Sequence, residues 1–217
     1  MITNGTSGGL TIPRAAEFTK VEEFLELAPP PAAAIEHAKG TDVESDVPLI
    51  YAATMIQRPR LIVELGTRTG MTTRTLAYAA KQLGARFITI DPDDCLDFIR
   101  DVEPCDFIRM TGEEAFNQQK IQAPIDVLMV DTDRHTYEQS MGWLKTWVTH
   151  LLRPGGLAFF HDLYPPDDRV EIQVRQAVLD WLKRNPKYFW REFLASHDGL
   201  APLAHGPYGL GLLWKLA

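Results

Sequence analysis

The sequence predicts an α/β fold, a doubly wound and mainly parallel sheet of seven strands that finishes in an antiparallel C-terminal hairpin strand. From Val47 onward, short apolar runs typical of buried strands alternate with longer segments of helical periodicity. Segments 188–195 and 208–215 are both strand-like and have no helix between them, which favours antiparallel pairing. With 217 residues, 45% of them hydrophobic, the chain is long enough to bury one large core.

The elements follow in a regular order. Residues 1–46 are expected to form an N-terminal arm or cap with one short helix at 21–27, which the prolines at 29–31 end. Residues 47–217 are expected to form the main domain. Its other predicted strands are 61–64, 86–90, 107–110, 125–130 and 157–160. Its predicted helices are 48–56, 72–83, 95–102, 113–121, 137–152 and 169–185.

Composition excludes several classes of function. The chain has 29 acidic against 22 basic residues, and no cluster of Lys and Arg with aromatic residues suits a nucleic acid. No apolar run approaches the roughly 20 residues that cross a bilayer, and the first residues do not resemble a secretory leader. We therefore expect a cytoplasmic protein that binds neither nucleic acid nor membrane. The two cysteines, Cys95 and Cys105, predict neither a disulfide framework nor a zinc site.

The segment LIVELGTRTG, residues 61–70, is the most informative motif. An apolar strand ends in Glu64, and Gly66 and Gly70 allow the following turn to pass close to a ligand. A dinucleotide-binding fingerprint would need G-x-G-x-x-G, whereas this segment has E-x-G-x-x-x-G, with an acid where a pyrophosphate would be repelled. A small ligand with a cationic end is the better fit.

Polar side chains follow four of the predicted strands. Glu64, Asp91, Asp131 and the pair His161 and Asp162 stand at or just after strand ends. Ligands of open α/β sheets bind at the carboxyl ends of the strands, so these groups are expected to share one crevice. Asp91 lies 21 residues beyond Gly70, the separation at which an acid binds ribose hydroxyls. Capping of the next helix is the simpler role for any one acid, but four together favour a site for an adenosine-containing ligand.

The motifs ELGTRTG, ITID, VDTDRHTY and LLRPGG before FFHD occur in the order found in class I S-adenosylmethionine-dependent methyltransferases, which the chain resembles from about Pro48 to its end. The resemblance implies a Rossmann-like methyltransferase fold. It also implies that Glu64 faces the ammonium or sulfonium region and that Asp91 holds the ribose. Gly112 and Glu113 match the region that borders the adenine, although Glu113 could equally cap a helix. The cofactor-binding candidates are Glu64, Gly66, Thr67, Gly70, Asp91, Gly112, Glu113 and Asp131.

The second half of the chain resembles the metal-dependent small-molecule O-methyltransferases of the catechol, caffeoyl-CoA and macrolide-sugar type. In those enzymes an Asp after the fourth strand and two adjacent residues after the fifth bind a divalent metal, which implies Asp131, His161 and Asp162 here. Carboxylate ligands suit Mg²⁺, and a histidine would shift the preference toward Mn²⁺ or another softer metal. His161 could instead lie in the core or behind the ligands.

Methyl transfer to a hydroxyl requires removal of its proton, because a phenol with a pKa of ~10 is mostly protonated at neutral pH. The catechol-type pattern has a Lys three residues after the first metal-binding Asp. Arg134 stands at that position and remains a cation, so of the two candidate catalytic residues, Arg134 and His135, we expect His135 to be the base. A surface histidine that begins a helix is the alternative. Tyr164 with Pro165 and Pro166 is expected to face the acceptor, whereas Trp143, Trp147 and Trp181 are expected to pack in the core.

The sequence thus predicts an S-adenosylmethionine-dependent O-methyltransferase that acts on a hydroxyl of a small molecule with the help of a divalent metal. A metal-independent small-molecule methyltransferase is the nearest alternative. An NAD-linked oxidoreductase and a non-catalytic cofactor-binding module are more distant ones, and the missing third glycine disfavours NAD. The sequence leaves open the identity of the acceptor and whether the chain forms a homodimer or a higher homo-oligomer.

Overall fold

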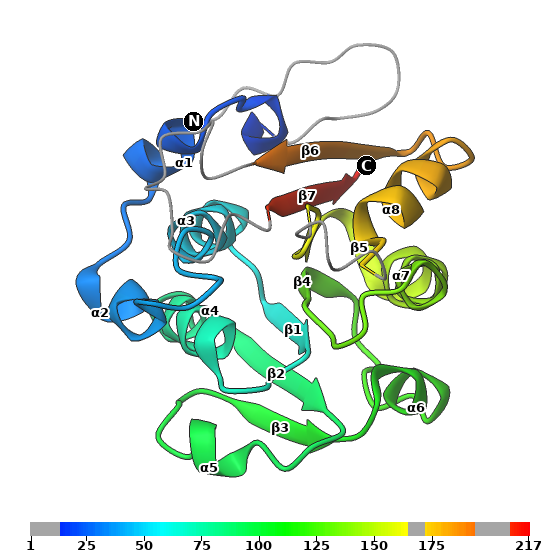
Figure 1. The fold of residues 1–217 in the computed structure, drawn as a ribbon. Coiled ribbons are helices and arrows are strands. Elements are labelled where there is room, and N and C mark those ends of the chain that lie inside the picture. The colour runs from blue at the N-terminus through cyan, green and yellow to red at the C-terminus, as the bar shows by residue number, and fades with distance from the viewer. Residues whose placement is uncertain (1–13, 165–171, 194–208) are drawn as a thin grey trace.

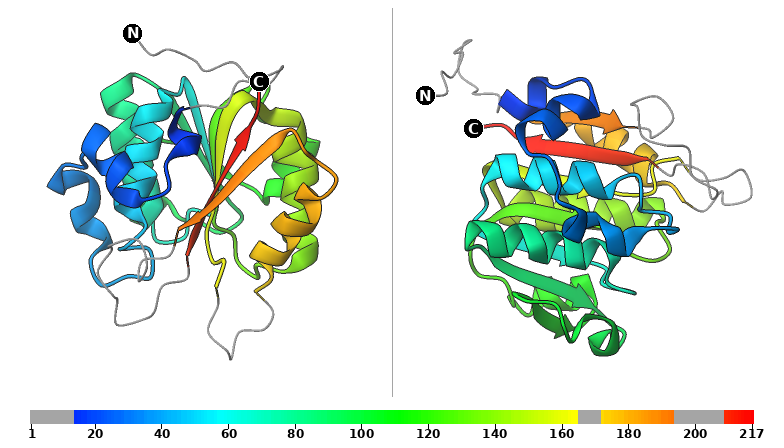
Figure 2. Two further views of the ribbon diagram at one scale, coloured as in Figure 1. Left: turned by 90° about the horizontal axis from the view of Figure 1, so that it is seen from above. Right: turned by 90° about the vertical axis from the view of Figure 1, so that its left-hand side faces the viewer.

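The computed structural model describes residues 14–164, 172–193 and 209–217. Seven strands form one sheet. Helices cover both faces of this sheet (Figure 1), and the view from above in Figure 2 separates the layers. The strand order is β3-β2-β1-β4-β5-β7-β6. The strands are β1 (Leu61–Leu65), β2 (Arg86–Asp91), β3 (Asp106–Arg109), β4 (Ile125–Val130), β5 (Leu152–Phe160), β6 (Tyr188–Phe193) and β7 (Leu210–Lys215). The predicted α/β fold is confirmed.

The direction of the strands also follows the prediction. Strands β1 to β5 pair in parallel, and β7 pairs antiparallel with both β5 and β6. Every residue of β1 and β4 is buried, as expected for central strands covered on both faces. The carboxyl ends of the five parallel strands therefore share one edge of the sheet.

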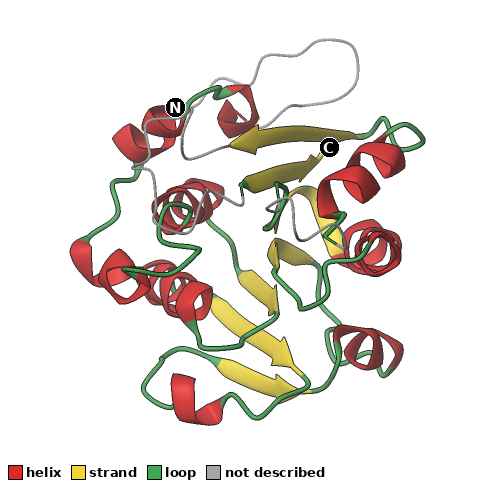
Figure 3. Cartoon of the chain, viewed as in Figure 1, coloured by secondary structure: helices red, strands yellow, loops and turns green. Residues whose placement is uncertain are grey.

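Helices flank the sheet on both sides (Figure 3). One face packs against α1, α3 and α4, and the other packs against α6, η3 and α8. Neighbouring residues of a strand contribute to opposite faces, as Ile62 and Val63 do. The helical elements are η1 (Arg14–Glu17), α1 (Val21–Leu27), α2 (Ala32–Ile35), η2 (Glu36–Ala38), α3 (Val47–Gln57), α4 (Met71–Leu83), α5 (Leu96–Ile99), α6 (Gly112–Asn117), α7 (Tyr137–Trp143), η3 (Leu144–Leu151) and α8 (Val174–Leu182).

The described part of the N-terminal arm packs on the body of the protein. Phe24 of α1 is fully buried, and its ring centroid lies 5.7 Å from that of Phe193 in β6. Phe18 packs edge-on against Phe24 at 4.9 Å. These aromatic contacts join the described part of the N-terminal arm to β6, an edge strand of the sheet.

Three predicted helices differ from the observed ones in extent. The segment predicted as 137–152 is α-helical only to Trp143 and continues as the π-helical turns η3. The helix predicted at 113–121 ends at Asn117, because Gln119 is left-handed at φ 52° and the Lys120 N–H bonds the Ala115 carbonyl. The helix predicted at 95–102 is only the short α5.

Strand β5 and helix α8 also differ from the prediction. Strand β5 begins at Leu152 and not at Leu157, with a register shift against β4 that accommodates the Pro and glycines of 154–156. Helix α8 begins at Val174, and residues 169–171 of its predicted range lie outside the described residues. Within the described residues, no helix is long and apolar enough to cross a membrane.

Candidate functional site

Backbone hydrogen bonds bring the predicted site residues to one edge of the sheet. The ladder between strands continues one step beyond their ends, where the Asp131 N–H donates to the Leu65 carbonyl at 3.0 Å. In the same way, the His161 N–H donates to the Val130 carbonyl at 3.2 Å. The residues that follow β1, β4 and β5 therefore lie side by side, as the position of each after a parallel strand predicts.

The glycine turn after β1 is shaped by a contact with the chain itself. Gly66 has φ 96°, and a Cβ at this position would lie 1.8 Å from the carbonyl oxygen of Asp131. Only glycine can occupy such a position. The sequence explained Gly66 by the approach of a ligand, but in the structure the close neighbour is the backbone after β4. Gly70, at φ 79°, precedes the first residue of α4.

Asp91 fixes the same turn from the end of β2. Its Oδ2 accepts hydrogen bonds from the backbone N–H groups of Thr67 and Arg68 at 2.8 and 3.0 Å, and its Oδ1 accepts one from Asp93 at 2.9 Å. The Thr67 side chain is buried, with its hydroxyl 2.6 Å from that of Thr89. Asp91 thus holds the loop against β2. Its Oδ2 already accepts two hydrogen bonds, whereas its Oδ1 accepts one backbone hydrogen bond and retains a lone pair for a ligand.

Glu64 lies deeper than the resemblance implied. Its side chain is fully buried and accepts hydrogen bonds from the hydroxyls of Thr72, Thr73 and Thr89 at 2.5 to 2.7 Å. Burial raises the pKa of Glu64 to about 7, although the three hydroxyls act in the opposite direction. Glu64 therefore ties β1 and β2 to the first turn of α4 in the described structure.

Gly112 and Glu113 lie in the first turn of α6. The helix is capped by Thr111, whose hydroxyl accepts from the Glu114 N–H while the Glu114 carboxylate accepts from the Thr111 N–H. Glu114, and not Glu113, therefore completes the cap of α6 with Thr111, and the Glu113 side chain is exposed. A Cβ at Gly112 would lie 3.0 Å from the Trp143 ring.

Trp143 differs from the other two tryptophans. Trp147 and Trp181 are buried in the core as predicted, whereas Trp143 is only partly buried. Its indole N–H donates to the Thr132 hydroxyl at 3.1 Å, which joins α7 to the loop after β4. Sequence periodicity could not separate Trp143 from the other two, because all three share helical spacing with apolar residues.

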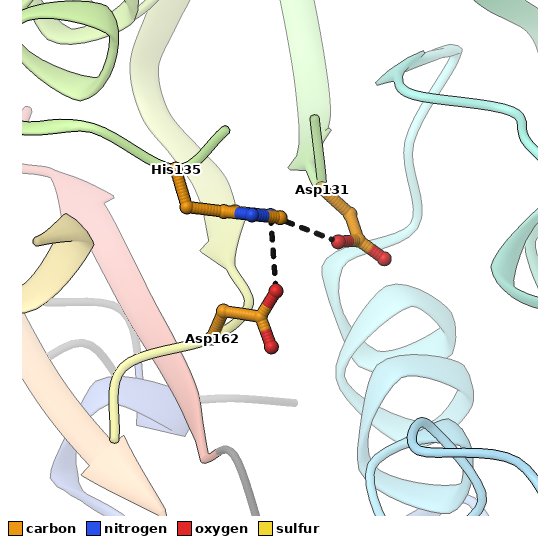
Figure 4. Close-up of side chains that lie close together, drawn as sticks. All are labelled: Asp131, His135 and Asp162. Carbon is orange, nitrogen blue, oxygen red and sulfur yellow. Dashed lines mark ion pairs between the residues drawn. The ribbon is translucent and has the colours of Figure 1, made fainter. Parts of the chain in front are cut away.

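Asp131, His135 and Asp162 converge at the edge of β4 and β5 (Figure 4). One ligand atom from each lies within 4.8 Å of the other two. His135 Nε2 is 3.0 Å from Asp162 Oδ2 and 3.5 Å from Asp131 Oδ1. His135 is therefore directed at both carboxylates and is not a surface histidine, since its side chain is 12% exposed.

The backbone at this cluster is strained. Arg134, His135 and Asp162 have φ values of 76°, 43° and 58°, in the left-handed region that residues other than glycine rarely adopt. The His135 carbonyl accepts a hydrogen bond from the Gln173 N–H at 2.8 Å, so the residue preceding α8 helps to hold this turn. Such strain persists only where its surroundings enforce it, and it is concentrated at functional sites. The Arg134 side chain itself is exposed.

The charges of the cluster stabilise one another. Burial alone would lower the pKa of His135, but hydrogen bonds and charges of Asp131 and Asp162 outweigh it and raise that pKa to about 9. Burial opposes ionisation of Asp162, yet its contacts with His135 and His161 lower its pKa to about 2. The pKa of Asp131 is likewise lowered, since the charge of His161 and the contacts with His135 outweigh burial.

His161 lies behind this cluster. Its side chain is 1% exposed, and its Nε2 is 3.2 Å from Asp46 Oδ2. Its Nδ1 is 3.1 Å from Asp162 Oδ1 and 3.5 Å from Asp131 Oδ1. The structure thus brings together the predicted ligands Asp131 and Asp162 with His135 as the third convergent group, whereas His161 contacts the two carboxylates from the buried side.

Of the residues expected to face the acceptor, the structure describes Tyr164. The Tyr164 hydroxyl donates to Glu192 of β6, and the Arg175 guanidinium lies over the Tyr164 ring at 5.2 Å. Pro165 and Pro166, also expected near the acceptor, lie outside the described residues.

Asp46 was not foreseen as a site residue, because it stands before an ordinary helix, far in sequence from the other groups.

Comparisons with known proteins bear on the fold and on the class of protein. Residues 63–163 match a family model described as a methyltransferase domain. The search of curated proteins gave no match. Three solved structures with the same fold are an O-methyltransferase from Bacillus cereus in complex with SAH, the O-methyltransferase TomG from Streptomyces achromogenes in complex with SAM, and the SAH-bound methyltransferase PaMTH1 from Podospora anserina.

The agreement in fold extends over most of each chain. The B. cereus structure is 16% identical with a TM-score of 0.62, and the match covers 88% of this chain and 94% of that one. TomG is 17% identical with a TM-score of 0.63, and the match covers 89% of this chain and 94% of that one. PaMTH1 is 14% identical with a TM-score of 0.58, and the match covers 89% of this chain and 92% of that one. The expected Rossmann-like methyltransferase fold is confirmed, and the match of residues 63–163 to the methyltransferase-domain model supports the expected class of enzyme.

Proposed function

We propose that the protein transfers the methyl group of S-adenosylmethionine to a hydroxyl of a small molecule, with the help of a divalent metal. The match of residues 63–163 to a methyltransferase-domain model supports the methyl-transfer part of this proposal. The convergence of Asp131, His135 and Asp162 beside the glycine turn is the observation that carries this proposal. It provides an acceptor side to the crevice whose donor side is the turn after β1.

The donor side is supported by the turn at 66–70 and by Asp91. The backbone contact between Gly66 and Asp131 fixes the relative positions of the two loops, and Asp91 is held at the end of β2 with a lone pair of its Oδ1 available to a ribose hydroxyl. Solved structures of this fold contain SAM or SAH. The buried Glu64 would then act through the turn that it supports, by holding the threonines at the start of α4.

The chemistry of the convergent side chains fits a divalent metal. Two carboxylates and one imidazole offer hard oxygen ligands and one softer nitrogen, a set that suits Mn²⁺ at least as well as Mg²⁺. The lowered pKa of Asp162 and that of Asp131 keep both carboxylates ionised at neutral pH, as ligands must be. When bound, such a metal would stabilise the oxyanion of the acceptor hydroxyl.

His135 fits the role of third ligand better than that of a general base. A pKa of about 9 leaves only about one molecule in a hundred with neutral His135 at pH 7, so few molecules could accept a proton from the substrate. A metal at the two carboxylates would displace the His135 proton and free Nε2 for coordination. The Arg134 side chain is exposed, and a guanidinium does not act as a base.

The experiment combines binding and turnover. Calorimetry should detect binding of S-adenosylmethionine and of S-adenosylhomocysteine to the protein, but no binding of NAD. Release of S-adenosylhomocysteine should then be followed with a panel of catechols, simple phenols and sugars, in EDTA and after addition of Mn²⁺ or Mg²⁺. We expect turnover to disappear in EDTA and to return with metal, and Asp131→Asn to prevent the return. Exposed Asp133→Asn is the matched control.

A metal-independent methyltransferase is the second candidate, and one observation favours it. The cluster is already charge-compensated, because His135 and His161 lie within 3.5 Å of the carboxylates of Asp131 and Asp162. In that case proximity of donor and acceptor would supply most of the rate. Full turnover after exhaustive chelation would establish this alternative and exclude the metal.

A further inference from the structure

The strongest feature outside the proposed ligand set is the buried pair of Asp46 and His161. Asp46 precedes the first residue of α3, and His161 follows β5, so the pair joins two distant parts of the chain. Their side chains are 2% and 1% exposed, and Asp46 Oδ2 is 3.2 Å from His161 Nε2. Two ionisable groups buried to this degree are costly unless their charges compensate each other, so the ion pair favours one orientation of the imidazole.

The other edge of the His161 ring meets both carboxylates of the proposed metal site. Nδ1 is 3.1 Å from Asp162 Oδ1 and 3.5 Å from Asp131 Oδ1. Asp162 is thus contacted on Oδ1 by His161 and on Oδ2 by His135. Asp162 also sits in a left-handed backbone conformation at φ 58°, which by itself is unfavourable and needs such support.

We propose that Asp46 and His161 are positioning residues that hold the carboxylates of Asp131 and Asp162 in the geometry that binds the metal, and that His135, not His161, completes the ligand set. The inference rests on the metal site of the proposed function. It gives the segment before α3 a direct part in the site, because Asp46 acts on the ligands through one imidazole. Partners behind metal ligands of this kind typically change metal affinity by about 10- to 100-fold when they are replaced.

The test uses Mn²⁺ alone, titrated into the full chain and followed by electron paramagnetic resonance. Asp46→Asn and His161→Asn should each weaken Mn²⁺ binding by about 10- to 100-fold. The double variant should be no weaker than His161→Asn, since Asp46 acts through His161. Asp42→Asn, the same replacement four residues earlier in the same segment, should bind Mn²⁺ as the wild type does. Calorimetry with S-adenosylhomocysteine reports whether each variant keeps the folded crevice.

Pulsed resonance identifies the nitrogen ligand, a signal that a purely structural role would not change. The modulation from a coordinated imidazole nitrogen should persist in His161→Asn and disappear in His135→Gln. If Asp46→Asn fails to fold, His161→Gln, which keeps a polar side chain of similar reach, takes its place in the same titration.

Each outcome decides a different question. No Mn²⁺ binding by the wild-type protein would overturn the proposed metal role and this inference with it. Equal Mn²⁺ affinity of Asp46→Asn, His161→Asn and the wild type would overturn the positioning role and leave the proposed function intact. Loss of the nitrogen signal in His161→Asn, with its retention in His135→Gln, would make His161 the ligand and would likewise overturn the inference.

Discussion

Gly66 and Asp131 are in backbone contact, so close that a Cβ on Gly66 would lie 1.8 Å from the Asp131 carbonyl oxygen. The contact joins the turn expected to hold the methyl donor to the residue expected to hold the metal. The loops after β1 and β4 are therefore packed directly against each other, so a displacement of one loop toward the other would cause a backbone clash.

Gly66→Ala should disrupt this packing. The new methyl group would collide with backbone, which cannot rotate away as a side chain can, and the residue would keep an unfavourable φ of 96°. Gly84→Ala is the matched control, because Gly84 also has a positive φ but no atom within 4 Å of an added Cβ. Denaturant unfolding should show the left-handed penalty of about 1–2 kcal/mol in Gly84→Ala. The free energy of unfolding of Gly66→Ala should be lower by roughly a further 1–3 kcal/mol, because the added methyl group overpacks the contact. Equal stability of the two variants would contradict the contact.

Asp91→Asn should weaken binding of S-adenosylhomocysteine. The carboxylate accepts hydrogen bonds from the Thr67 and Arg68 N–H groups, and hydrogen bonds to a charged group contribute roughly 1.5–3 kcal/mol each. We expect calorimetry to report an affinity lower by about 10- to 100-fold. The neighbouring exposed Asp94→Asn should leave the affinity unchanged. An unaltered affinity in Asp91→Asn would show that the turn keeps its shape without this charge.

Glu64 should make stability depend on pH in a defined window. Burial raises the pKa of Glu64 from its ordinary value of 4.5 to about 7, so the native state binds more protons than the unfolded state between these values. The contribution of Glu64 to stability is therefore fully present below about pH 4.5 and is lost as pH rises to about 7. Relative to Glu64→Gln, the wild-type free energy of unfolding should fall across this window by up to about 3 kcal/mol.

The control for Glu64 is the exposed Glu113→Gln, whose unfolding should follow the wild-type pH profile. Denaturant unfolding at several pH values measures both variants. A difference between the wild type and Glu64→Gln that stays constant with pH would show that Glu64 is ionised throughout, with its charge balanced by the three threonine hydroxyls.

Mn²⁺ affinity should rise with pH if His135 is a ligand. With a pKa of about 9, His135 must lose a proton before its Nε2 can coordinate, so the affinity should increase by about tenfold per pH unit between about pH 6 and 8. His135→Gln should show a lower affinity and a shallower slope, whereas the exposed His150→Gln should match the wild type. An identical slope in His135→Gln and the wild type would argue against coordination by His135.

Local patterns predicted most of the fold. The strand 125–130 and the helix 21–27 coincide with β4 and α1, because apolar runs and helix-ending prolines act over a few residues. The predicted helix 137–152 was too long and the predicted start of β5 too late, since sheet pairing carries Leu152 into the strand. Such boundaries depend on neighbours far away in the chain.

The sequence by itself determined the α/β fold and the position of Glu64, Asp91, Asp131 and Asp162 at one edge of the sheet, because parallel strands separated by helices must end at a common edge. Only the tertiary structure decided how these groups pair. It turned His135 toward the two carboxylates, buried His161 behind them and brought Asp46 to its far side. Those distances depend on left-handed turns and on packing between distant segments, and no local sequence pattern encodes them.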